Sequence, residues 1–166
     1  MITLKDARDK AAILTKSKIP AALSLHHWKN IGVISGVVDY SIDDKTGGKS
    51  GLYPDHVVIE IATAAELRKE ITLKKIGEVR AAIIEKLKDQ DKDLEDIASI
   101  GSDAGLDIIS EKSLEEVELI NLDYQDLLVL KLMDTYIRTF CKMRNKLFNQ
   151  SKEVENNGDT IRSEKV

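Results

Sequence analysis

The side chains of this 166-residue chain that could do chemistry are its histidines, its cysteine and its carboxylates, and their spacing argues against catalysis. His26 and His27 are adjacent, so on a helix they point about 100° apart and do not readily ligate one metal ion. A helical zinc site needs histidines about four residues apart with further ligands nearby. Cys141 lies in an apolar helical stretch, which predicts an unreactive thiol. These residues predict neither a metal centre nor a nucleophile.

Glycine motifs that hold phosphate groups are also missing from the sequence. Gly47, Gly48 and Lys49 lack the strand before them and the helix after them that a P-loop requires. The many carboxylates of the second half are scattered, as on the solvated faces of helices. We therefore expect a protein that is not an enzyme and that needs no metal or other cofactor.

Composition places the chain among globular proteins. It is 42% apolar and 33% charged, which allows a buried core and excludes disorder over the whole length. A single cysteine excludes an internal disulfide framework and a multi-cysteine zinc site. No apolar run reaches roughly 18 residues, and the first residues lack the layout of a signal peptide. The expectation is a soluble cytoplasmic protein without a membrane partner.

Charge is divided unevenly along the chain. Residues 1–88 hold 15 Lys and Arg against 11 Asp and Glu, whereas residues 89–166 hold 10 against 18. The front half could approach a polyanion, which the back half would repel. The acidic half is a candidate surface for a protein partner, although such a split also occurs without functional consequence.

The front half predicts a helix, a turn and a second helix. Residues 3–16 have apolar side chains at spacings of three and four, with Thr3 as the N-cap. A polar, basic turn follows, and Pro20 fits the first turn of the next helix, which ends near Gly32.

A hairpin and two more helices follow. The β-branched residues after Gly32 favour a strand over residues 33–40, and a turn-rich tip leads to a short return strand at Leu52 and Tyr53. A third helix follows Pro54, and Thr72 can cap a fourth helix that reaches Leu87.

The back half predicts an acidic linker over residues 89–112, a long helix over residues 113–150 and a disordered tail over residues 151–166. An apolar stripe on the long helix recurs at spacings of four and three, which favours self-association as a coiled coil. The alternative is that this stripe packs within one chain. The stripe contains Val129, Met133, Tyr136, Phe140, Met143 and Leu147.

This order of elements predicts a mainly α fold: a winged helix-turn-helix domain over residues 1–88 with a small β-hairpin wing, plus a long C-terminal helix forming a coiled-coil dimer. In such a domain the second helix enters the DNA major groove, and lysines on the hairpin reach the phosphates beside it.

Three segments resemble the MerR-type regulators. Residues 24–34, SLHHWKNIGVI, resemble that family's T-L-R-Y-Y-x-x-x-G-L-I run, and residues 51–57, GLYPDHV, resemble its wing return, Y-x-x-x-D-[VL]. Residues 67–76, LRKEITLKKI, are similar to its L-R-x-x-G-x-S-L-x-x-I run. The resemblance implies a homodimer that binds double-stranded DNA and regulates transcription.

Departures from that pattern bear on DNA affinity. His26 stands where the family has an arginine, and a neutral histidine contributes less to phosphate binding. Ser50 and Gly51 replace a Tyr-Arg pair, and Ile71 replaces a glycine. The alternative function is a winged-helix module that binds another protein and not DNA.

The predicted DNA-binding residues lie on the turn, the second helix and the hairpin. Trp28 and Tyr53 are also expected to contribute to the core, with the Tyr53 hydroxyl as a candidate phosphate contact. The full set is Lys16, Lys18, Ser24, His26, His27, Lys29, Lys45, Lys49 and Tyr53.

Overall fold

The computed structural model describes residues 1–42, 47–99 and 124–163. The predicted mainly helical architecture is confirmed, with one small antiparallel sheet of strand order β1-β3-β2. The elements in chain order are β1 (Ile2–Thr3), α1 (Leu4–Leu14), α2 (Ala22–Asn30), β2 (Asp39–Ile42), β3 (Lys49–Tyr53), α3 (Val57–Leu67), α4 (Leu73–Lys88), α5 (Leu94–Ser99) and α7 (Tyr124–Ser163).

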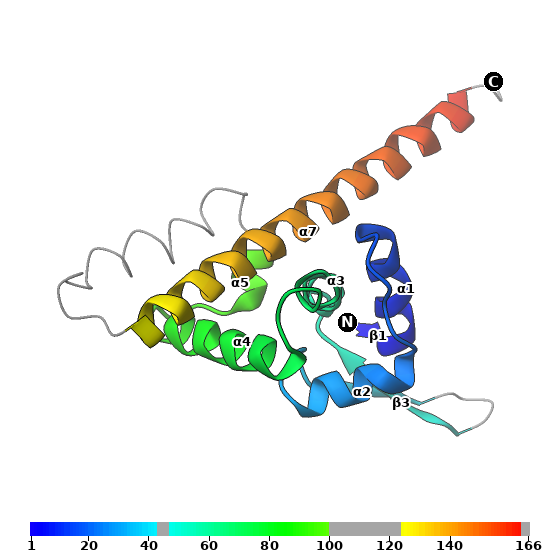
Figure 1. Cartoon of the computed structure of the whole chain (residues 1–166). Helices are drawn as coiled ribbons and strands as arrows, with labels where there is room; N and C mark the ends of the chain where they lie inside the picture. The colour runs from blue at the N-terminus through cyan, green and yellow to red at the C-terminus, as the bar shows by residue number, and fades with distance from the viewer. Residues whose placement is uncertain (43–46, 100–123, 164–166) are drawn as a thin grey trace.

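Helix α3 forms the centre of the molecule. Almost all of its residues are buried, because its sequence, VVIEIATAAEL, is apolar except at Glu60, Thr63 and Glu66. Helices α1, α4 and α7 pack around it, and α7 contacts it most extensively. Figure 1 shows α3 seen nearly along its axis, with these helices around it. One hydrophobic cluster therefore joins residues from β1 to α7.

Two helix starts are fixed by their own N-caps, as the sequence predicted. The Thr3 hydroxyl accepts a hydrogen bond of 3.2 Å from the Asp6 amide, and the Thr72 hydroxyl accepts one of 3.3 Å from the Lys75 amide. The buried face of α1 is the predicted one, at spacings of three and four. It consists of Leu4, Ala7, Ala11 and Leu14.

The strand predicted over residues 33–40 is wrong for most of its length. Gly32 takes a positive φ of 76°, and the chain after it is irregular until β2 begins at Asp39. Val33 and Ile34 are instead buried in the core. Their β-branched side chains are buried although this segment is not paired with a β-strand. The sequence also gave no sign of β1, whose Ile2 pairs with Tyr53.

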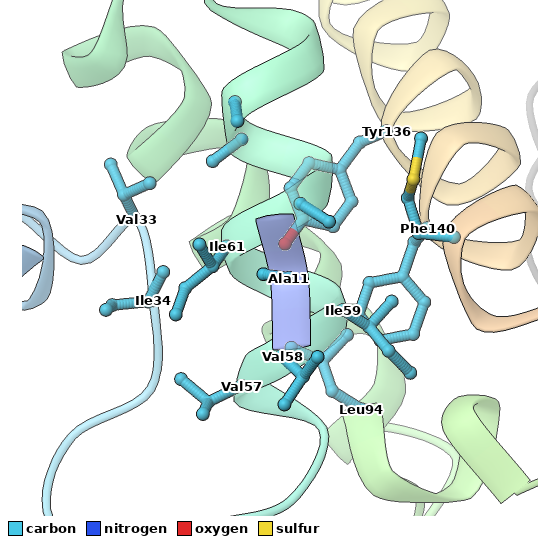
Figure 2. Packing of buried hydrophobic residues seen from close by; sticks show 14 of the residues in the cluster. Ala11, Val33, Ile34, Val57, Val58, Ile59, Ile61, Leu94, Tyr136 and Phe140 are labelled. Atoms are coloured by element: carbon cyan, nitrogen blue, oxygen red, sulfur yellow. The ribbon is translucent and has the colours of Figure 1, made fainter. Parts of the chain in front are cut away.

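Helix α7 closes the core, which corrects the expectation that its apolar stripe meets a partner helix. Met133, Tyr136, Phe140 and Met143 are at most 1% exposed within the single chain. Figure 2 shows Tyr136 and Phe140 pointing from α7 into the cluster around α3. These four side chains cannot contact a second copy of the chain, because they already pack against the apolar surface of α3.

The two ends of α7 also bear on the sequence predictions. Residues 113–123, the predicted start of the long helix, lie outside the described residues. Up to Ser163 the predicted disordered tail is helical, since α7 continues past Asn149. The segment that follows Asn149 contains no proline, and a single internal glycine does not end a helix.

A buried ion pair ties the chain after α2 to α3 and α4. The Arg80 Nε donates to the Glu60 Oε1 at 2.7 Å, and the Glu60 side chain is fully buried. The other Glu60 oxygen accepts the Ser35 amide at 2.7 Å. Arg80 also donates to the Ser35 hydroxyl at 2.9 Å and to the Gly32 carbonyl at 3.4 Å. The irregular segment between α2 and β2 is therefore held by charge-assisted hydrogen bonds.

Close approach of α4 to the end of α2 requires a glycine at position 77. A Cβ there would lie 2.5 Å from the Ile31 carbonyl oxygen. We predict that Gly77→Ala lowers the free energy of unfolding by about 1–3 kcal/mol, because backbone must shift to admit the methyl group. Urea unfolding measures the change. Gly36→Ala is the matched control, since a Cβ at Gly36 meets nothing within 4 Å. Equal stabilities for the two variants would contradict the close approach.

Within the described ranges, none of the helices combines the length and the apolar character that crossing a membrane requires.

Candidate nucleic-acid interface

Residues 10–38 contain no aspartate or glutamate. This segment covers the end of α1, the turn that follows, α2 and the irregular chain beyond it. The side chains of Lys16 and Lys18 are exposed on the turn, and those of Ser24, His26 and His27 are exposed on α2. We call these five residues the basic surface. Its positive charge is not offset by any acid of its own segment.

A glutamate of α3 holds the turn from inside. The Glu66 carboxylate accepts a hydrogen bond of 2.6 Å from the Thr15 hydroxyl and another from the Ser17 hydroxyl. The Ser17 amide also donates to the Thr15 hydroxyl at 3.0 Å. Thr15 and Ser17 are buried, so the turn alternates inward hydroxyls with outward lysines. This alternation directs Lys16 and Lys18 to solvent.

Three cationic side chains bind the carbonyls of the same turn. Lys146 of α7 donates to the Leu14 carbonyl at 2.8 Å, Arg68 donates to the Lys18 carbonyl, and the Arg8 Nε donates to the Pro20 carbonyl at 2.9 Å. A cation near the last carbonyls of α1 also suits the negative end of the helix dipole. The turn is thus fixed at four points, and it sets where α2 begins.

The hydrogen bonds from Ser17 and Thr15 lower the pKa of Glu66 to about 2. A carboxylate with a lowered folded-state pKa stabilises the fold above its ordinary pKa near 4.5, and that contribution is lost as the pH falls towards 2. The stabilisation belongs to the turn, because the turn supplies the two main donors.

We predict that Glu66→Gln lowers the free energy of unfolding by about 1 kcal/mol at neutral pH, a value reduced for the exposed third of the side chain. The difference from wild type should shrink between about pH 4.5 and pH 2, as both proteins then carry a neutral group. Urea unfolding across this range measures it. Glu70→Gln, at an exposed neighbour, is the control. A pH-independent difference would contradict the role of the charge.

Helix α2 buries one side and exposes the other. Leu25 and Trp28 are in the core, as predicted for Trp28, while Lys29 is half-buried. Arg68 lies over the Trp28 ring at 5.7 Å and so braces the helix from the inner side. The N-cap position, Ala21, supplies no side-chain hydrogen bond, and the first turn of α2 contains no acid. The first amides of α2 therefore present partial positive charge to an anion.

The hairpin of β2 and β3 carries one predicted contact on its surface. Lys49 is exposed, with its Nζ 4.0 Å above the Tyr40 ring. Lys45 lies outside the described residues. Tyr53 is only 1% exposed, which corrects its prediction as a phosphate contact. It faces the core from the base of β3, and burial raises its pKa.

Sequence reasoning missed the residues that position the basic surface. Arg8, Glu66, Arg68 and Lys146 contact the turn from up to 132 positions away in the chain. No local pattern marks such a contact. The one available signal is that a turn with two buried hydroxyls requires hydrogen-bond partners from elsewhere.

A pocket of about 450 Å³ lies beside the Glu60–Arg80 pair. In its lining, the His56 Nε2 is 3.1 Å from the Ser35 hydroxyl, the pairing found in nucleophilic catalysis. A catalytic histidine also needs a group that orients its other nitrogen, and the buried His56 Nδ1 has no hydrogen-bond partner among the described residues. Arg80 already donates to the serine oxygen. These contacts join His56 and Ser35 to the Glu60–Arg80 pair.

Within the described residues, no group of three or more His, Cys, Asp and Glu side chains could hold a metal ion. Cys141 is buried, and burial raises its pKa, so it is held as the neutral thiol.

Comparison with known proteins finds no match among family models, curated proteins or solved structures.

Proposed function

We propose that this protein is a sequence-specific DNA-binding regulator of transcription that acts as a homodimer. In this proposal α1, the anchored turn and α2 form a helix-turn-helix, and the β2–β3 hairpin is its wing. Helix α2 would lie in the major groove, while Lys16, Lys18 and Lys49 neutralise phosphates on either side.

The observation that carries the proposal is the anchored basic surface, whose own segment, residues 10–38, contains no acid. Phosphate binding is favoured where cations lack competing carboxylates. The carboxylate that contacts the turn, that of Glu66, accepts the hydroxyl hydrogen bonds of Thr15 and Ser17. Positioning on a duplex requires a fixed angle between turn and helix. The contacts of Glu66 and Arg68 to the turn supply that constraint. Exposed Ser24, His26 and His27 then face outward from the same helix.

The proposed dimer contact lies on the projecting part of α7. The buried stripe is occupied by the chain's own core, but α7 runs well beyond the body of the molecule (Figure 1). Phe148, where the helix leaves the core, is 50% exposed. A helix of 40 residues is about 60 Å long, so its distal part can meet a second copy while the domain stays intact.

The test is selection of duplexes from a random DNA library by the full chain at about physiological salt. Enrichment of an inverted repeat is the expected result, since a two-fold dimer reads two related half-sites. Failure of the folded protein to enrich any duplex would overturn the proposal.

The alternative function is a module that binds another protein. It is favoured by the exposed apolar side chains of the edge strand β2 and the residue before it: Val38, Tyr40 and Ile42 are between 53% and 69% exposed. An edge strand with such side chains can add a strand from a partner. The same selection separates the two functions, because a protein-binding module enriches no DNA sequence.

A further inference from the structure

A leucine lies on the outward side of α2, where a solvated helix would carry a polar residue. Leu23 is 82% exposed, more than any other large apolar side chain in the described part of the chain. It contributes nothing to the core, which α2 contacts through Leu25 and Trp28. Packing among the described residues therefore does not explain its exposure.

Leu23 lies on the same side of α2 as His26 and His27. Leu23, His26, His27 and Asn30 follow one another at spacings of three, one and three, so they form a single ridge on the exposed side of α2. Leu23 is in the first turn of α2. His27 lies about one turn further along the helix, a rise of about 6 Å along its axis. That rise corresponds to roughly two base-pair steps, since successive pairs are about 3.4 Å apart.

The start of α2 is also the part of the helix next to exposed cations and uncapped backbone amides, both of which favour an approaching duplex. Lys16 and Lys18 are exposed on the turn just before it, and Ala21 leaves its first amides uncapped. In helix-turn-helix proteins the N-terminal residues of the second helix contact base edges. Along the floor of the major groove, the C5-methyl group of thymine is the apolar feature that a leucine can cover.

We propose that Leu23 reads a thymine methyl group in each half-site, with His27 at a base pair about two steps away. This inference rests on the proposed DNA-binding function and specifies the chemical class of its site: duplex DNA with a thymine at one fixed position of each half-site. A methyl group buried against leucine contributes about a fourfold gain in affinity.

The test uses uracil, which differs from thymine only by lacking that methyl group. Duplexes selected by the full chain are resynthesised with uracil at one thymine position at a time, in both half-sites, and affinities are measured by fluorescence anisotropy. For wild type, one position should show a loss of about fourfold for each methyl group removed. Leu23→Ala should bind the thymine duplex more weakly by the same factor, and should not distinguish thymine from uracil.

Ile13→Ala is the matched control, because Ile13 is also exposed, at 69%, but lies near the end of α1 and off the ridge. It should keep the uracil effect. Circular dichroism shows whether each variant folds, and neither residue is part of the core. If the protein selects duplexes, but no thymine position shows a methyl effect that Leu23→Ala removes, the inference is overturned and the DNA-binding function still stands. Selection of no duplex would overturn the function itself, and this inference with it.

Discussion

Replacing Arg80 by methionine is expected to lower the free energy of unfolding by about 3–5 kcal/mol. The methionine fills most of the same volume, but it leaves the Glu60 carboxylate fully buried without its counter-charge. It also removes the hydrogen bonds from Arg80 to the Ser35 hydroxyl and the Gly32 carbonyl. Urea unfolding at neutral pH measures the loss, and a change below about 1 kcal/mol would show that the pair is solvated in solution.

The double variant Glu60→Met with Arg80→Met separates charge from packing. Removing both charges together abolishes the buried unpaired carboxylate, so part of the lost stability should return. Recovery should be incomplete, because the double variant also removes the Glu60 oxygen that accepts the Ser35 amide. A double variant less stable than the sum of the single changes would contradict this account.

Neutralising the proposed phosphate contacts should weaken DNA binding at all sequences alike. We expect Lys16→Gln, Lys18→Gln and Lys49→Gln together to reduce affinity about 100-fold. The slope of log K against log salt should fall by about one for each lysine side chain lost, which is about two for each substitution in the dimer. Each of these lysines is exposed, so the protein should remain as stable as wild type. Anisotropy titrations at several salt concentrations measure both quantities.

The control for this charge change is Lys88→Gln with Lys131→Gln, two exposed lysines near the end of α4 and the beginning of α7. They lie away from the basic surface, so their loss should change affinity by less than about threefold through long-range charge alone. Equal effects of the two sets would indicate a response to net charge, and the assignment of the turn and hairpin as the contact surface would then fail.

The parts of the fold that could be predicted are those set by interactions between residues close together in the sequence. Thr3 and Thr72 cap their helices through amides three residues away, so the sequence was sufficient to predict both helix starts. Val33 and Ile34 were assigned to a strand because burial in a core and pairing in a sheet favour the same β-branched residues.

The long stripe of α7 illustrates the same limit. Its spacing correctly indicated that one face of the helix is buried, but periodicity does not identify what covers that face. Here the cover is α3 of the same chain. For the candidate site, the exposure of Lys16 and Lys18 could be predicted from a polar turn. Their orientation could not, because it depends on Glu66, about 50 residues away.

The hydrogen bond from Lys146 to the Leu14 carbonyl spans 132 positions of the chain, and it bears on how the protein is made. At a synthesis rate of about 5–20 residues per second, the first helices wait roughly 7–26 s on the ribosome before the segment that completes their core exists. Contacts of such sequence separation also slow folding after release. Until then the apolar surface of α3 is uncovered, so a chain truncated before α7 would present that surface to chaperones and proteases.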